Sequence, residues 1–212
     1  MFKNREEAGQ LLSEKLKFVI NDRENTILLA IPRGGVVVAK EVAVALGLTL
    51  DIIAPRKIGA PFNPELALGA VSPEGQVYIN NEIVSLVGVN KSYIEEEIKR
   101  QIQEAKRRMF LYRKGKPFSI IKKEVIIVDD GIATGATMIV AIRSVRAKGA
   151  KKVIVAAPVI SPEAFVLLKN EADEVISLIM PSTFYAVGEF YEDFRQVTDE
   201  EVLEILSFIQ SD

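Results

Sequence analysis

The sequence predicts an α/β fold in which a mostly parallel central sheet is flanked by helices. Short apolar runs bounded by turn residues alternate with longer segments of helical periodicity, as in successive βαβ units. Hydrophobic residues make up 49% and charged residues 26% of the 212 positions, which is enough to build one sizeable core. We therefore expect a single domain over residues 1–212, with a helical insert at 80–116 and a C-terminal hood and helix at 181–212.

The N-terminal quarter predicts a helix followed by one βαβ unit. Asn4 and Glu7 have the spacing of a capping box, and an apolar stripe follows them: Ala8, Leu11, Leu12, Leu16, Val19 and Ile20. Residues 26–31 and 50–54 are typical of buried strands. The valines of residues 36–46 would suit a strand too, but the length of this segment and Gly47 at a C-cap position favour a helix.

A change of character at residues 56–75 predicts a long, mobile loop. Three prolines and three glycines interrupt it, and loops of this length usually carry function or are disordered. We expect it to run into a hairpin of residues 68–71 and 77–79. Ser92 and Glu95 then open a strong helix, whose acidic residues come early and whose basic residues come late, as the helix dipole favours.

The parallel pattern resumes after residue 123. Strands are expected at 124–128, 153–158 and 174–180, and helices at 136–148, 162–170 and 199–209. Ser161 is the expected cap of the second of these helices, and Thr198 with Glu201 opens the third. Residues 184–194 are aromatic and irregular, and would either close over a ligand or pack on the core.

Composition excludes several kinds of chemistry. The chain has no cysteine and no histidine, so disulfides, thiolate or histidine metal sites and a Ser–His–Asp triad are absent. The net charge of −2 gives no general attraction to nucleic acid. The N-terminus lacks the apolar core of a signal peptide, and no apolar run approaches the ~20 residues of a membrane span. We expect a soluble, cytoplasmic protein.

The most informative segment is residues 124–137, where an apolar strand ends in Asp129 and Asp130. A loop of small and hydroxyl residues follows and leads into a helix: Gly131, Ile132, Ala133, Thr134, Gly135, Ala136 and Thr137. Unpaired N–H groups at a helix N-terminus bind phosphate, and the small residues let a phosphate approach the backbone. The paired carboxylates suit a vicinal diol. Phosphate and diol together describe a ribose 5-phosphate. The segment lacks the Gly-Lys-Ser/Thr ending of a Walker loop.

Residues 125–137 closely resemble the phosphoribosyl pyrophosphate (PRPP) signature of the type I phosphoribosyltransferase family, and the resemblance extends over about residues 1–180. It implies that Asp129 and Asp130 hold the ribose hydroxyls, while the backbone of 133–137 and its two threonine hydroxyls cradle the 5′-phosphate. Residues 54–71 are most similar to a group of stand-alone members without an assigned acceptor.

Two further segments resemble parts of the same family. Arg33, Gly34 and Gly35 follow the first strand, where family members place a short pyrophosphate-binding loop. Arg56 and Lys57 begin the long loop where the family carries a mobile catalytic flap. For the first of these segments, the alternative interpretation is a turn with an exposed arginine.

The reaction implied by this resemblance is displacement of pyrophosphate from ribose C1 by a nitrogen nucleophile, with Mg²⁺ carried mainly by PRPP near Asp129 and Asp130. Enzymes of the family that act on 6-oxopurines carry an aspartate where this chain has Ala133, so any general base must come from elsewhere. Glu65 is the candidate base. Phe184 and Tyr185 are candidates for stacking on the acceptor, whose identity the sequence does not reveal.

Two other functions remain open at this stage. A PRPP- or nucleotide-sensing regulator on the same fold is favoured only by a basic cluster that would suit RNA: Lys106, Arg107, Arg108, Arg113, Lys114, Lys116, Lys122 and Lys123. An Mg²⁺-dependent phosphatase or kinase would need a second carboxylate cluster or a Walker lysine. We expect small-molecule partners, no DNA and no membrane, and a homodimer would fit the family.

Overall fold

A five-stranded parallel sheet forms the centre of the protein, as predicted. The computed structural model describes residues 1–115 and 119–209. In the sheet, every strand runs parallel to its neighbours, in the order β2 (Thr49–Ile52), β1 (Thr26–Ala30), β6 (Glu124–Val128), β7 (Lys152–Val159), β8 (Glu174–Ile179). The carboxyl ends of β1 and β6 are in register, since Ala30 pairs with Val128. The loops that follow these two central strands therefore meet at one edge of the sheet.

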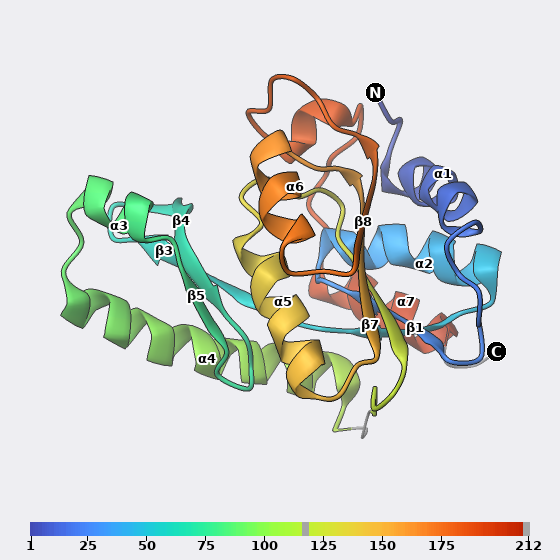
Figure 1. Ribbon diagram of the computed structural model, residues 1–212, viewed down its shortest axis with the longest axis horizontal. Helices are drawn as coiled ribbons and strands as arrows, with labels where there is room; N and C mark the ends of the chain where they lie inside the picture. Colours follow the sequence, from blue (N-terminus) through green and yellow to red (C-terminus); the bar gives the residue numbers. More distant parts are fainter. Residues whose placement is uncertain (116–118, 210–212) are drawn as a thin grey trace.

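Helices cover both faces of this sheet (Figure 1). One face carries α1 (Arg5–Leu16), α2 (Gly34–Leu46) and α7 (Asp199–Ile209), and the other carries α5 (Ala136–Ala147) and α6 (Pro162–Lys169). Alternate residues of each strand serve the two faces, so Leu28 and Ile126 join the first core while Ile27 and Ile127 join the second. Because both faces are buried, the central strands are apolar after their first residues, Thr26, Glu124 and Lys152, which is why they were predictable.

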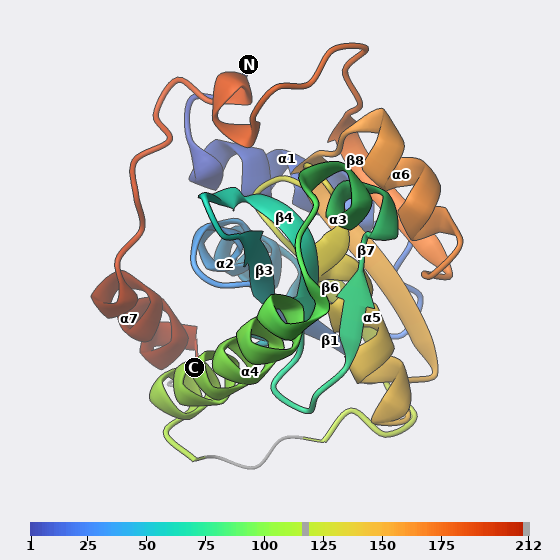
Figure 2. The ribbon, with the colours of Figure 1, turned by 90° about the vertical axis from the view of Figure 1, so that its left-hand side faces the viewer.

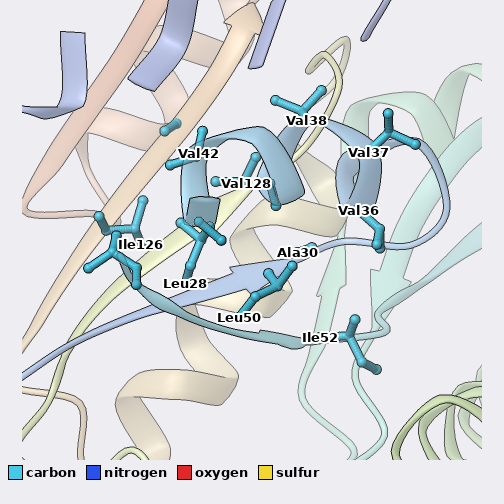
Figure 3. Close-up of a cluster of buried hydrophobic side chains, with 14 of the residues drawn as sticks. Leu28, Ala30, Val36, Val37, Val38, Val42, Leu50, Ile52, Ile126 and Val128 are labelled. Carbon is cyan, nitrogen blue, oxygen red and sulfur yellow. The ribbon is translucent and has the colours of Figure 1, made fainter. Parts of the chain in front are cut away.

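The core beneath α2 fixes the start of that helix against the sheet. Figure 3 shows Leu28, Leu50 and Ile126, from three neighbouring strands, pointing toward α2, whose Val42 lies above them. Val36 and Val38 are also fully buried. The valines that left the helix uncertain in the sequence are therefore the residues that hold it on the sheet.

A second, antiparallel sheet stands where most of the long loop was expected. It consists of β3 (Arg56–Ala60), β4 (Asn63–Val71) and β5 (Val77–Ile79). The expected hairpin of β4 and β5 is present, but the prediction of a loop from residue 56 is wrong for β3 and the first half of β4. Pro61 and Pro64 masked these strands in the sequence, yet they lie only at the turn and at the second residue of β4, where proline is tolerated.

Two helices of the insert cover this small sheet, α3 (Asn81–Val87) and α4 (Lys91–Arg113). Ile58, Leu68 and Val71 form its core, against which Ile98 and Ile102 of α4 pack. Figures 1 and 2 show α4 running along this sheet and on toward α7. The small sheet also rests on α5, because Ala70 packs against Ala136 and Val140. The base of the hairpin is thereby tied to the start of α5.

Most helix ends agree with the sequence prediction. The side chains of Asn4 and Ser161 cap α1 and α6, Gly47 ends α2 in the left-handed conformation, and Thr198 and Glu201 form a reciprocal capping box. Three details differ: Asn90 rather than Ser92 caps α4, α1 ends before Val19 and Ile20, and Leu11 of the predicted apolar stripe is exposed. Among the residues that the structure describes, no helix has both the length and the apolar character to cross a membrane.

The aromatic segment at 184–194 packs on the core. It contains a short 3₁₀ helix, η1 (Val187–Phe190), and Tyr191 pairs with Phe2 beside α1. Of the two alternatives left open by the sequence, packing is therefore observed at the C-terminal part of this segment.

The central strand β1 should be the most sensitive point of the main core. Leu28→Ala removes a side chain that is 0% exposed, and we expect a loss of about 2 to 5 kcal/mol in the free energy of unfolding. Val44→Ala, on α2 but 62% exposed, should change it by less than about 0.5 kcal/mol. Urea denaturation of both variants checks this, and similar losses would contradict the assigned core.

Candidate functional site

The acidic loop after β6 lies at the carboxyl edge of the parallel sheet. Asp129 and Asp130 follow Val128 directly, and the loop of residues 131–135 leads into α5. The loop is anchored from outside: the N–H of Ile132 donates to the carbonyl of Val159 at 2.9 Å, and the hydroxyl of Ser161 donates to the carbonyl of Ala133 at 2.6 Å. Both anchors come from the β7–α6 connection, so the neighbouring strand holds the loop in place.

The start of α5 presents a row of backbone donors. Gly135, the N-cap residue, has a φ of 76°, a left-handed conformation that favours glycine, and it offers no side chain to cap the helix. Within residues 1–115 and 119–209, no acceptor faces the N–H groups of Thr134, Gly135, Ala136 or Thr137, and no partner faces the hydroxyls of Thr134 and Thr137. Together with the positive end of the helix dipole, these donors suit an anion.

Asp130 is held by Arg5, the first residue of α1. The Arg5 Nε donates to Asp130 Oδ2 at 2.7 Å, and the two side chains are only 9% and 14% exposed. Arg5 Nη1 donates to the carbonyl of Arg195 at 2.9 Å, and its guanidinium lies 3.8 Å from the ring centroid of Phe194. The ion pair thus joins α1, the acidic loop and the segment before α7, and leaves Asp130 Oδ1 for other partners.

The C-terminal segment also touches the acidic loop directly. Tyr191 donates its hydroxyl to the carbonyl of Asp130 at 2.5 Å. A Cβ on Gly131 would overlap the side chain of Val187, so glycine is required by the close approach of η1. Burial and the charge of Asp130 raise the pKa of Tyr191, which therefore stays a donor. This part of the C-terminal segment, which was predicted to form a hood, therefore supports the acidic loop.

Asp129 is the more confined of the two acids. Its Oδ1 accepts the N–H of Asp130 at 2.9 Å. Burial, followed by the negative charge of Asp130, raises the pKa of Asp129 well above the usual range of an aspartate. Arg5 opposes that rise, but its charge is already engaged by Asp130. The pair therefore combines a carboxylate that is paired with a cation and a carboxyl group whose pKa is raised.

The β1–α2 loop packs against these acids. A Cβ on Gly34 would overlap the Asp130 carboxylate and crowd Arg5, and one on Gly35 would press on the backbone of Val128 and Asp129. The two glycines of the predicted pyrophosphate loop are therefore required by close contact with the acidic loop. The structure brings these two sequence-predicted segments together.

Arg33 lies between that loop and the C-terminal helix. It is the N-cap residue of α2, it follows a cis peptide bond, and its Nη1 lies 3.7 Å from Asp199 Oδ1 at the start of α7. Tyr112 of α4 donates its hydroxyl to the same carboxylate oxygen at 2.6 Å. Half-buried rather than fully solvated, Arg33 is thus positioned by two elements that sequence reasoning did not connect with it.

The three catalytic candidates of the predicted flap lie on the β3–β4 hairpin. Lys57 Nζ pairs with Glu65 Oε2 at 2.9 Å, and Arg56 Nε donates to Gln101 Oε1 at 3.1 Å. The hydrogen bond and charge of Lys57 lower the pKa of Glu65. A cavity of about 470 Å³ between the hairpin and α4 is lined by these three residues and by Tyr93, Arg100 and Gln101. In the part of the chain that the structure describes, no hydrogen bond or ion pair joins this group to Asp129 or Asp130.

Among the predicted site residues, those expected near the acceptor substrate are the least fixed by contacts. Ala133 is exposed on the acidic loop. Phe184 packs against Phe190 with ring centroids 5.4 Å apart, so one of its faces is occupied, while Tyr185 is exposed.

The basic cluster does not form one free surface. Arg107 and Arg108 both pair with Glu104, and Arg113 pairs with Asp51. Lys123 donates to the carbonyl of Glu24. Lys116 lies outside the described residues.

Among the residues that the structure describes, no group of three or more acidic side chains is placed to hold a metal ion. The oxygens of Asp129 and Asp130 left by Arg5 and by the backbone suit Mg²⁺ only in the form that this ion prefers, with several waters and substrate phosphates as its other ligands.

Sequence reasoning missed Arg5, Ser161, Tyr191 and Asp199 as parts of the site. Arg5 lies 125 residues before Asp130, in what the sequence shows as the first turn of an amphipathic helix. Ser161 was predicted, but only as a helix cap. No local pattern marks a residue whose role is to touch a distant loop.

Most of the chain matches one family of known proteins. The family model described as the phosphoribosyl transferase domain matches residues 1–195. Two curated relatives from Mycobacterium tuberculosis, strains CDC 1551 / Oshkosh and ATCC 25618 / H37Rv, are provisionally named phosphoribosyl transferases. Each is 37% identical over 207 residues, which is 97% of this chain but only 46% of the relative. The chain thus spans about half the length of the curated relatives it matches.

Solved structures extend this comparison. A crystal structure of a protein from Thermus thermophilus is 45% identical, with 97% of both chains covered and a TM-score of 0.77. A protein from Neisseria gonorrhoeae, solved with bound ppGpp, has a TM-score of 0.50 at 15% identity, with 98% of each chain covered, and so shares the fold alone.

The Arg5–Asp130 pair should contribute strongly to stability. Arg5→Met leaves the nearly buried Asp130 carboxylate without its cation. We expect a loss of about 3 to 5 kcal/mol in the free energy of unfolding. The matched control is Lys3→Met, because Lys3 also pairs with an acid near the N-terminus but is 77% exposed. Its loss should stay below about 0.5 kcal/mol. Denaturant unfolding of both variants is the measurement, and equal effects would contradict the ion pair.

Asp129 should make the protein less stable as the pH rises. Its pKa is higher in the folded than in the unfolded chain, so the folded state must ionise a confined carboxyl group once the pH exceeds its folded pKa. Asp129→Asn avoids that cost. We expect the variant to melt at a higher temperature than the native protein at pH 8, with a difference that shrinks toward pH 4. Glu96→Gln, on the exposed face of α4, is the control. A variant that is less stable than the native protein at every pH would refute this.

Proposed function

We propose that this chain, which belongs to the phosphoribosyl transferase domain family, binds PRPP and transfers its ribose 5-phosphate to a nitrogenous acceptor of the nucleobase class, releasing pyrophosphate. The observation that carries the proposal is the row of unpaired donors at the start of α5, directly beside the Asp129–Asp130 pair. A phosphate seat adjoining a diol-binding acid pair matches the two ends of a ribose 5-phosphate.

The 5′-phosphate would bind to the loop of residues 133–137. The N–H groups of Thr134 to Thr137 point away from any acceptor in the described chain, and two threonine hydroxyls add donors. Ser161 and the β7 backbone already hold this loop, so little ordering is needed when the phosphate arrives. The glycine cap at Gly135 leaves the helix end open to the anion.

The two acids would bind the ribose hydroxyls in different ways. Asp130 is paired with Arg5 through Oδ2, so its Oδ1 would accept a hydrogen bond from one hydroxyl. Asp129, with its raised pKa, can donate as well as accept. A vicinal diol, whose hydroxyls both donate and accept, is suited to such a mixed pair.

The pyrophosphate would lie against the β1–α2 loop. Gly34 and Gly35 bring this loop into contact with the acids, and Arg33 supplies a cation at the start of α2. A Mg²⁺ ion carried by the substrate near Asp129 and Asp130 would neutralise part of the charge that develops on the leaving pyrophosphate.

The β3–β4 hairpin would supply the remaining cations. Lys57 is engaged by Glu65 in the free protein, and an incoming pyrophosphate competes for it. Because Lys57 lowers the pKa of Glu65, that carboxylate is a weak base while the pair lasts. We therefore assign Glu65 to holding Lys57 first, and to proton transfer only after Lys57 has moved to the substrate. Closure of the hairpin would exclude water, the competing nucleophile.

The regulatory alternative lacks a specific observation in its favour. Three of the arginines expected to form an RNA surface already have carboxylate partners, and two of these pairs lie largely inside the protein. We therefore carry forward the transferase alone.

Calorimetric titration of PRPP, with and without Mg²⁺, tests the proposed site. The native protein should bind in a Mg²⁺-dependent manner, and Asp129→Asn/Asp130→Asn should weaken binding on the order of a hundredfold, since both acids that would bind the ribose hydroxyls are lost. Glu95→Gln/Glu96→Gln removes the same charge from the exposed start of α4 and should bind like the native protein.

Release of pyrophosphate on adding single nucleobases would then identify the acceptor. Absence of PRPP binding by the native protein at millimolar concentration would overturn the proposal.

A further inference from the structure

One face of the insert helix α4 is turned toward the proposed pyrophosphate side of the site. Gln101, Glu104, Arg108 and Tyr112 recur at steps of three and four residues, which places them on one side of the helix. The face is anchored at both ends: Gln101 accepts from Arg56 at 3.1 Å, and Tyr112 donates to Asp199 at 2.6 Å. Figure 2 shows the C-terminal half of α4 lying beside α7.

Arg108 belongs to this inward face, whereas its neighbour Arg107 does not. The side chain of Arg108 is 19% exposed and that of Arg107 is 58% exposed. Both pair with Glu104: Arg107 through Nε and Nη2 at 2.7 and 2.9 Å, Arg108 through Nε alone at 3.1 Å. The terminal nitrogens of Arg108 face no acceptor in the part of the chain that the structure describes.

Arg56 and Arg33 also keep guanidinium nitrogens that face no acceptor in the described residues. Arg56 uses only Nε, on Gln101, and Arg33 lies 3.7 Å from Asp199, beyond hydrogen-bond distance. Burial, followed by the like charge of Arg108, lowers the pKa of Arg56, and the charge of Glu104 opposes that shift. Half-buried arginines that retain unused donors are stabilised by an anion.

The acids near this cluster are shared with other partners. Glu104 is held mainly by Arg107, whose hydrogen bonds lower its pKa to about 2, and Asp199 is shared with Tyr112. Glu97, which lies near Arg56, pairs with Arg100. An anion with several oxygens and more than one negative charge would satisfy three separate guanidinium groups.

We propose that the insert helix contributes a binding residue to the site: Arg108, together with Arg33 and Arg56, takes the diphosphate group of the substrate and of the released pyrophosphate. This inference rests on the proposed function, which supplies a ligand with a diphosphate. Asp199 and Tyr112 act as positioning residues, because they hold Arg33 toward the cluster.

The test is calorimetric titration of inorganic pyrophosphate and, separately, of ribose 5-phosphate at fixed ionic strength. Arg108→Gln should weaken pyrophosphate binding on the order of tenfold, because a charged donor is lost, and should leave ribose 5-phosphate binding unchanged. Arg107→Gln is the matched control, with the same charge change and the same Glu104 partner, and should bind both probes like the native protein. Arg108→Lys should recover part of the loss. Thermal melting of each variant verifies that it is folded.

The outcomes separate the two proposals. Equal weakening by Arg107→Gln and Arg108→Gln would overturn the role of Arg108, because it would reflect net charge alone. Binding of ribose 5-phosphate without pyrophosphate by the native protein would overturn the diphosphate cluster and leave the acidic loop in place. Binding of neither probe would remove the proposed function, and this inference with it.

Discussion

The ion pair between Arg5 and Asp130 is the constraint on which the site depends. It joins the first helix to the loop after the central strand β6, over 125 residues of sequence, and both side chains are nearly buried. Gly34 has no room for a side chain because this pair occupies the space, and Phe194 covers the guanidinium from the C-terminal side. Four segments are therefore fixed around one carboxylate. A charge this buried needs its partner, so none of the four can shift alone.

The parallel sheet explains why these segments meet. Because β1 and β6 are adjacent and in register, the loops after them emerge at the same edge, and each begins a helix whose first N–H groups face that edge. Both helices start without a side-chain cap. Elsewhere, the chain caps its helices with Asn4, Asn80, Asn90 and Ser161. Among the α-helices of residues 1–115 and 119–209, the two that begin without a side-chain cap are those whose ends adjoin the acid pair, as a site for an anion would require.

The sequence predicted what depends on local pattern and missed what depends on distant contact. Buried strands such as β6 are apolar after their first residue, and caps such as Ser161 precede their helices directly, so both were visible. Strand β3 and the first half of β4 were taken for a loop, because their apolar residues are widely spaced among prolines and are covered by α4, which follows later in the chain. The acid pair and its loop stood out as one continuous motif. Arg5, Tyr191 and Asp199 did not, since each acts through space on a residue far away in sequence.

Several groups of the free protein are held at an energetic cost that a ligand would relieve. Asp129 is confined beside Asp130, Arg56 is confined near Arg108, and the first N–H groups of α5 have no acceptor in the described chain. The acids directly precede the loop of unpaired donors, and Arg33, in the β1–α2 loop, lies 3.7 Å from Asp199 at the start of α7. A ligand that is anionic at both ends and carries hydroxyl groups between them would satisfy the donors, the acids and the arginines together. A simple phosphate or a diol alone would leave some of these groups without a partner. The unpaired donors, the confined acids and the arginines together, more than any single residue, favour a sugar that carries phosphate at both ends.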